Sequence, residues 1–194
     1  MSHAEGVNVK RRRVLIASTA AIGAVGVGAI ATPFVRSWYP SAKAEAAGAA
    51  VVTDIAGVET GQMITLKYRG KPIFVVKRTE EMVANLAEVA SRLADPNSDA
   101  SVQPENCKND TRSVQPEILV VEGVCTHLGC APLFRPEVGA ADLGGSDWFG
   151  GFFCPCHGSK YDLAGRVYSG QPAPANLPVP IYKIEGSILT VGEA

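Results

Sequence analysis

Two short motifs, CTHLGC at residues 125–130 and CPCHGS at residues 154–159, restrict the structures open to this chain more than any other feature. They contain four of the five cysteines and two of the three histidines among its 194 residues. Each motif places one cysteine and one histidine close enough to bind a single centre, as C-x-H in the first and C-x-x-H in the second. The sequence therefore predicts a fold that brings two separate loops together around one shared group.

The residue types decide which group the loops could share. Two thiolates and two imidazoles can hold either zinc or an iron–sulfur cluster. Zinc fingers take a cysteine pair followed by a histidine pair, whereas here the two residue types alternate along the chain. We therefore expect a two-iron cluster, with one iron on Cys125 and Cys154 and the reducible iron on His127 and His157. A cluster held by four thiolates would leave both histidines without a role.

The second cysteine of each motif has a different expected role. Cys130 and Cys156 are placed to join the two loops by a disulfide, a bond that persists in an oxidising compartment. Such a bridge contributes about 2 to 4 kcal/mol to stability. Cys107 has no remaining partner, so we expect it to be a free thiol.

The N-terminal segment differs from the rest of the chain in charge and hydropathy. Residues 14–35 form a run of 22 residues without a charge, preceded by four cations at residues 10–13 and followed by Arg36. As a helix this run would be about 33 Å long, enough to cross a hydrocarbon core of about 30 Å. We expect a cytoplasmic basic N-terminus over residues 1–13 and a transmembrane anchor over residues 14–37.

The same segment resembles a twin-arginine export signal, because paired arginines precede a weakly hydrophobic stretch rich in alanine and glycine. A cleaved signal peptide is the alternative, and Ala42-Lys43-Ala44 is an acceptable cleavage site. The apolar run exceeds the roughly 7 to 15 residues usual for such signals, and Trp38-Tyr39 suit a membrane interface. We therefore favour a retained, single-pass anchor.

Residues 38–50 are predicted to be a flexible hinge. The stretch SAKAEAAGAA at residues 41–50 has no large apolar side chain. It could be a flexible tether spanning roughly 17 Å, or a short alanine-rich helix. From residue 38 onward the chain carries 13 basic and 18 acidic side chains, a net charge of −5. That balance argues against binding to a nucleic acid.

The pattern after residue 50 predicts a mainly β domain over residues 51–194. Runs rich in β-branched residues indicate strands at residues 51–52, 63–68, 73–76, 118–121, 181–184 and 188–191. Gly70 and Gly186 are expected to form hairpin turns. Residues 79–93 carry apolar side chains at helical spacing and are followed by a polar loop over residues 97–112, which predicts one helix-loop insertion.

The two cysteine-histidine motifs resemble the signature of Rieske [2Fe-2S] proteins, in the form found in the cytochrome bc1 and b6f complexes. The likeness extends over the whole chain, from basic N-terminus and anchor to alanine-rich hinge, β domain and proline-rich stretch. It implies an antiparallel β-sandwich of Rieske type, with a small cluster-binding subdomain over about residues 122–174 and one [2Fe-2S] cluster. The motif of Rieske oxygenases and their ferredoxins generally lacks the disulfide pair, so it fits less well.

The resemblance also assigns individual side chains. The implied cluster ligands are Cys125, His127, Cys154 and His157, and the implied disulfide joins Cys130 to Cys156. Ser159 and Tyr161 match hydroxyl donors to the cluster or to a cysteine sulfur, which would stabilise the reduced, more negative state.

A second set of residues is expected to take part in docking. Leu128 resembles the apolar residue that meets the quinone-site protein. Gly170, Pro172 and Pro174 resemble the segment that covers the cluster. Gln171 is extra relative to the family pattern, and the spacer over residues 131–153 is longer than a minimal version.

The resemblance implies a subunit of a quinol–cytochrome c reductase in a bacterial cytoplasmic membrane, with its globular domain in the periplasm. Its implied partners are a cytochrome b subunit, a cytochrome c1 subunit and quinol, within a dimeric complex. It would take one electron from quinol, with a proton accepted by His127 or His157, and pass the electron to a c-type cytochrome. The alternatives are an electron-transfer subunit of another periplasmic oxidoreductase, such as arsenite oxidase, and a zinc-stabilised binding module.

Overall fold

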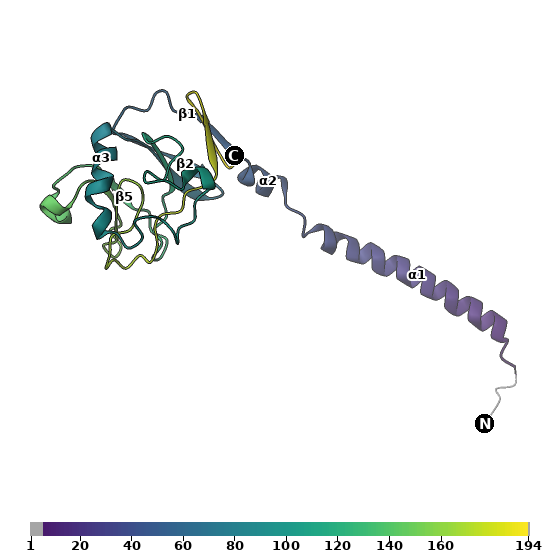
Figure 1. Ribbon diagram of the computed structural model, residues 1–194. Helices are drawn as coiled ribbons and strands as arrows, with labels where there is room; N and C mark the ends of the chain where they lie inside the picture. The colour runs from purple at the N-terminus through teal and green to yellow at the C-terminus, as the bar shows by residue number, and fades with distance from the viewer. Residues whose placement is uncertain (1–5, 194) are drawn as a thin grey trace. The chain divides into compact units, whose positions relative to one another are not determined.

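The computed structural model describes residues 6–193, so residues 1–5 of the expected basic N-terminus lie outside the described part. The chain divides into two compact units, with the boundary between residues 46 and 47 (Figure 1). This boundary falls within the predicted hinge. The predicted limits of the cluster-binding subdomain, residues 122–174, stay a prediction.

The first unit contains the long helix α1 (Val9–Arg36), which starts five residues before the expected apolar span and includes the cations of residues 10–13. Asn8 caps the helix, since its side-chain oxygen accepts a hydrogen bond from the backbone N–H of Arg11 at 3.1 Å. Within residues 6–193, α1 alone is long and apolar enough to cross a membrane, judged by length and composition.

A second, short helix, α2 (Ala42–Gly48), occupies most of the alanine-rich stretch. Of the two conformations considered for this stretch, the structure therefore shows the helix. Seven residues are fewer than the roughly 12 to 15 that an isolated helix needs for stability in water. Helix formation by itself therefore contributes little stability to this segment.

The second unit contains three three-stranded antiparallel sheets, which confirms the predicted antiparallel β architecture. The first sheet has the order β1 (Val51–Asp54), β9 (Ile188–Val191) and β8 (Tyr182–Glu185). The second has the order β2 (Met63–Tyr68), β3 (Lys71–Lys77) and β4 (Ile118–Glu122). The third has the order β5 (Leu133–Arg135), β6 (Gly151–Phe153) and β7 (Lys160–Tyr161).

The first two sheets follow from the sequence pattern. Each of the six predicted runs overlaps an observed strand. Strand β3 lies between β2 and β4, and its residues 73–76 are all buried, which explains their uninterrupted apolar character. Gly70, with φ of 80°, makes the predicted turn between β2 and β3, and Gly186, with φ of 62°, makes the one between β8 and β9.

The predicted helix-loop insertion is present. Helix α3 (Glu80–Glu88) is capped by Thr79, whose hydroxyl accepts a hydrogen bond from the backbone N–H of Met82 at 3.1 Å. The 3-10 turns η1 (Ala90–Arg92) and η2 (Glu105–Cys107) follow. Met82 and Leu86 of α3 pack with Leu163, in the segment after β7. Phe134 of β5 packs against the same cluster, so the insertion contacts the third sheet.

The spacer over residues 131–153 builds a second small core. It contains β5, β6 and the 3-10 turns η3 (Ala141–Leu143) and η4 (Gly145–Asp147), which stand at the edge of the domain in Figure 1, drawn in green. The cluster of buried side chains consists of Val89, Leu93, Leu143, Trp148 and Tyr168. The longer spacer therefore joins the helix insertion to the third sheet.

Candidate metal centre

The two motifs form two loops with the same backbone conformation. The first loop connects β4 to β5, and the second connects β6 to β7. In each loop the N–H of the first cysteine donates to the carbonyl five residues later at 2.8 Å, and the N–H four residues later donates back at 2.9 Å. That donor is Gly129 in one loop and Gly158 in the other, with φ of 85° and 81°. Both glycines adopt the left-handed conformation that side chains disfavour.

A disulfide joins the two loops. Cys130 is bonded to Cys156, with their Cα atoms 6.7 Å apart and a sequence separation of 26. This confirms the predicted bridge. The sulfur of Cys154 lies within 4.8 Å of both bridged sulfurs. Because the other two are consumed by the disulfide, Cys154 is the only one of the three that can ligate a metal.

The remaining cysteines and histidines of the motifs come together from both loops. Cys125 and Cys154 are free thiols, and both are buried. The imidazoles of His127 and His157 face each other edge to face, with ring centroids 4.7 Å apart and planes at 83°. His127 is half-buried and His157 is exposed. The loops therefore offer two thiols and two imidazoles, half from each loop.

One atom of this set tests whether these residues fit a metal ion. The Nδ1 atom of His127 is buried and has no hydrogen-bond partner among the described residues. A buried ring nitrogen without a partner is costly, and a metal ion is one group that can satisfy it. The donor set of two thiols and two imidazoles fits an iron–sulfur cluster of Rieske type.

The hydroxyl group of Tyr161 contacts the first loop. This oxygen lies 3.2 Å from the sulfur of Cys125, and it accepts a hydrogen bond from the backbone N–H of Thr126 at 3.2 Å. The hydroxyl of Thr126 donates to the carbonyl of Ala175 at 2.6 Å. Burial raises the pKa of Tyr161 far above its ordinary value, so the phenol keeps its proton.

The two thiols have different environments. Burial raises the pKa of Cys125, but hydrogen bonds from the Tyr161 hydroxyl and from the backbone N–H of His127 outweigh it, and the net pKa is lowered. Burial raises the pKa of Cys154, and the neighbouring Cys125 adds to the effect. The lowered pKa thus favours the thiolate, the form that binds metal, at Cys125.

Residues 170–174, the proline-containing segment, are attached to the second loop through Ser159. Its hydroxyl oxygen accepts a hydrogen bond from the backbone N–H of Ala173 at 3.1 Å, and both residues are buried. The predicted docking residues Gly170, Pro172 and Pro174 are exposed on either side of this bond. Leu128 at the first loop is also exposed, at 70% of its full surface.

Two contributors to the site were missed from the sequence. Thr126 connects Tyr161 to Ala175, and the side-chain oxygen of Gln171 accepts a hydrogen bond from the backbone N–H of Lys160 at 3.2 Å. The available signal was the position of Thr126 between two expected ligands, Cys125 and His127. Gln171 gave only the signal of an extra residue in the family pattern.

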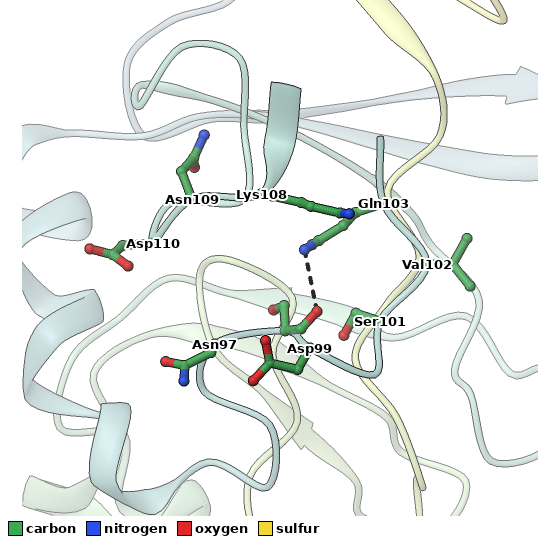
Figure 2. A pocket seen from close by; sticks show the side chains of 9 residues that line it. Asn97, Asp99, Ser101, Val102, Gln103, Lys108, Asn109 and Asp110 are labelled. Carbon is green, nitrogen blue, oxygen red and sulfur yellow. Dashed lines mark hydrogen bonds between the residues drawn. The ribbon is translucent and has the colours of Figure 1, made fainter. Parts of the chain in front are cut away.

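A hollow elsewhere in the domain has no part in this centre. It has a volume of about 570 Å³ and is lined by residues of the insertion between 97 and 110. Figure 2 shows the side-chain amide of Gln103 donating to the backbone carbonyl of Ser98 across one side of it. Its lining contains no cysteine or histidine.

The fold and the centre define a class of protein. An antiparallel β domain that presents two Cys-His loops joined by a disulfide is a Rieske-type iron–sulfur protein. In agreement, residues 49–183 match the family model of the Rieske [2Fe-2S] domain. Residues 1–41 match the model described as the ubiquitinol-cytochrome C reductase Fe-S subunit TAT signal.

Comparison with similar proteins identifies a narrower family within the Rieske class. The ubiquinol-cytochrome c reductase iron-sulfur subunit of Allochromatium vinosum is 54% identical over 192 residues, covering 98% of this chain and 92% of that protein. The subunit of the same name from Blastochloris viridis is 42% identical over 195 residues, covering 99% and 98%. A chain of a hyperthermophilic respiratory Complex III superposes with a TM-score of 0.51 at 27% identity, covering 89% and 96%.

The chain therefore belongs to the family of ubiquinol-cytochrome c reductase iron–sulfur subunits. It carries a [2Fe-2S] cluster of Rieske type and transfers electrons as part of a bc1 complex, an oxidoreductase. The family supports the bc1 assignment over the arsenite oxidase and zinc alternatives considered from the sequence.

Proposed function

We propose that Cys125 and Cys154 hold one iron of the cluster and that His127 and His157 hold the other. The observation that carries this assignment is the pair of imidazoles 4.7 Å apart, one from each loop, in which the buried Nδ1 of His127 lacks a partner among the described residues. Both thiols of the set are buried and outside the disulfide. This division of ligands matches Rieske centres, in which two histidines replace two cysteines on one iron.

When bound, a Rieske cluster accepts and returns one electron at a potential between about −150 and +300 mV. The surrounding side chains favour the added negative charge. The Tyr161 hydroxyl donates a hydrogen bond to the sulfur of Cys125. Because the Ser159 oxygen accepts from the N–H of Ala173, its own hydroxyl proton remains available for a sulfur acceptor.

His157 is the residue that meets quinol in this proposal. It is the exposed member of the histidine pair, whereas His127 is half-buried. An imidazole nitrogen of His157 accepts a hydrogen bond from a quinol hydroxyl and holds the proton that leaves as the quinol is oxidised. The exposed Leu128 and the prolines of residues 172–174 form apolar surface beside it for docking onto cytochrome b.

The partners and the orientation follow from the same proposal. The electron passes on to cytochrome c1, and the second electron of quinol passes to cytochrome b, within a dimeric complex. The cations at residues 10–13 precede the apolar part of α1, which by the positive-inside rule keeps the N-terminus in the cytoplasm and sends the globular domain to the periplasm. Quinol oxidation at His157 then releases protons on the outer side.

Residues 38–50 act as the hinge that lets the domain move between cytochrome b and cytochrome c1. The boundary between the two compact units lies inside this segment. Helix α2 is too short to be stable by itself, so it can melt or bend as the domain moves.

Low-temperature EPR of ascorbate-reduced membranes tests the ligand assignment. We expect a rhombic signal with a low average g value that appears with ascorbate and is lost in His157→Asn. Lys183→Met, a change on strand β8, should keep the signal. A signal that appears only with dithionite would show a low-potential cluster, and no signal with either reductant would favour zinc.

A further inference from the structure

Asn176 follows the proline-containing segment by two residues, and its side chain is buried, at 2% exposed. The amide oxygen accepts a hydrogen bond from the backbone N–H of Val167 at 2.8 Å. The amide nitrogen donates to the carbonyl of Asp95 and to the hydroxyl oxygen of Ser98, each at 3.0 Å. Because an N–H can only donate and a carbonyl can only accept, the amide fits its surroundings in one orientation.

Asp95 and Ser98 belong to the helix-loop insertion between β3 and β4, and this insertion also binds the next residue of the chain. The carbonyl of Leu177 accepts a hydrogen bond from the guanidinium of Arg112 at 2.9 Å, and Arg112 is completely buried. The N–H of Leu177 donates to the carbonyl of Gly165 at 2.8 Å. Residues 176 and 177 are therefore fixed to the insertion by side chains on both sides of the contact.

The carbonyl of Ala175, directly before Asn176, connects this supported segment to the metal centre. The hydroxyl of Thr126 donates to it at 2.6 Å, a short hydrogen bond. The backbone N–H of Thr126 donates to the hydroxyl oxygen of Tyr161 at 3.2 Å, and that oxygen lies 3.2 Å from the sulfur of Cys125. A continuous series of hydrogen bonds thus runs from the insertion to the first motif.

We propose that Asn176 is a positioning residue for the metal centre, because its bonds to the insertion fix the carbonyl of Ala175 that holds Thr126. The insertion thereby helps to set the reduction potential, although it lies outside both motifs. The inference rests on the ligand assignment proposed above, since Cys125 must be a ligand for its contact with Tyr161 to act on the cluster.

The direction of the effect follows from the same series of contacts. Without the bonds of Asn176, the carbonyl of Ala175 is free to shift, and the first loop can move relative to Tyr161. The hydrogen bond between Tyr161 and the sulfur of Cys125 is then longer on average. Because that bond stabilises the reduced, more negative state, its weakening lowers the potential.

A redox titration followed by EPR tests the proposal, on membranes that contain the full-length chain with its cluster. Asn176→Leu is uncharged, has a similar size and removes all three hydrogen bonds of the side chain. We expect the ratio of reduced to oxidised cluster at a fixed ambient potential to fall by about threefold. For one electron this corresponds to a potential lower by about 28 mV.

A double-mutant cycle separates positioning from a merely structural role. Thr126→Val removes the hydroxyl that binds Ala175 and keeps the branched shape of the side chain. In this background, Asn176→Leu should change the ratio by about 1.3-fold or less, because the connection to the centre is already broken. Equal threefold changes in both backgrounds would overturn the proposal, and so would an unshifted potential in Asn176→Leu alone.

Leu189→Ala controls for loss of stability. Leu189 is completely buried on β9, in a sheet that carries neither motif. Its truncation should lower the midpoint of urea denaturation at least as much as Asn176→Leu does, with the wild-type potential retained. An equal fall in potential in Leu189→Ala would show that the potential simply follows stability, and the proposal would be wrong.

Ser98→Gly replaces Asn176→Leu if that variant fails to fold. It removes only the hydroxyl acceptor, and glycine suits the φ of 59° at this position. We expect the ratio to fall by about twofold, and an unshifted potential would overturn the proposal. Failure of the ligand assignment has a different signature, because the ascorbate-reducible signal would then be absent from the wild-type protein itself.

Discussion

The hydroxyl oxygen of Tyr161, on strand β7, lies 3.2 Å from the sulfur of Cys125 in the first loop, within hydrogen-bond distance. The phenol is fully buried and its pKa is raised by that burial. Its proton therefore stays in place to stabilise negative charge on the sulfur. The reduction potential should depend directly on this contact.

Tyr161→Phe should lower the reduction potential by about 60 mV, since for one electron this corresponds to about 1.4 kcal/mol, part of what a hydrogen bond to a charged group contributes. The potential falls because the hydrogen bond stabilises the reduced state more than the oxidised one. A redox titration followed by EPR measures the change. Tyr68→Phe, on β2, is the control and should keep the wild-type potential. An unchanged potential in Tyr161→Phe would contradict the assigned role.

Removal of the disulfide should destabilise the domain by about 3 kcal/mol. Cys130→Ala and Cys156→Ala are made together, because either change alone would leave a new thiol close to Cys154. The bridge spans 26 residues, so its loss restores conformational freedom to the unfolded chain. Urea denaturation, with the visible spectrum as a record of cluster content, measures the effect. An unchanged free energy of unfolding would show that the two loops are held by other contacts.

The buried ion pair of Asp162 and Arg166 should contribute strongly to the stability of the domain. Their charged groups lie 2.7 Å apart, and Arg166 also donates to the carbonyls of Leu86 and Pro96 in the insertion. Asp162→Ala should cost about 3 to 5 kcal/mol, because it leaves a buried guanidinium without its counter-charge. Chemical denaturation of the domain measures this loss.

Two further variants control that experiment. Combining Asp162→Ala with Arg166→Met should recover part of the lost stability, since no unpaired charge then remains buried. Asp142→Ala breaks the exposed pair with Arg135 and should have a much smaller effect, because solvent already screens it. Equal losses from the buried and the exposed pair would be inconsistent with this account.

Stiffening the hinge should slow cytochrome c reduction while leaving the cluster spectrum intact. A run of prolines over residues 44–49 replaces the short α2 with a semi-rigid extended segment, and turnover should fall by roughly tenfold if the movement then limits the rate. Steady-state reduction of cytochrome c by quinol, with the visible spectrum recorded on the same membranes, measures both properties. A glycine–serine run of equal length should keep near wild-type turnover. Equal rates for the two replacements would argue against domain movement.

Local sequence patterns were enough to predict the features that local physics determines. The uncharged run before Arg36 predicts α1 because only length and hydropathy matter there. The β-branched runs predict β2, β3 and β4, and Gly70 predicts the turn that joins the first two, since a hairpin depends on neighbouring residues. The two motifs also indicate the disulfide between Cys130 and Cys156, because each motif contains one cysteine beyond its expected ligands.

Contacts between segments that are far apart in the sequence became known only from the tertiary structure. Strands β5, β6 and β7 have three, three and two residues, too few for a periodic pattern, and only their pairing with one another in the folded chain defines them. Arg78 and Arg112 have the sequence character of surface residues, yet both are buried, where they donate to the backbone carbonyls of Leu163 and Leu177. Their partners lie 85 and 65 residues away along the chain, and no local pattern records such a distance.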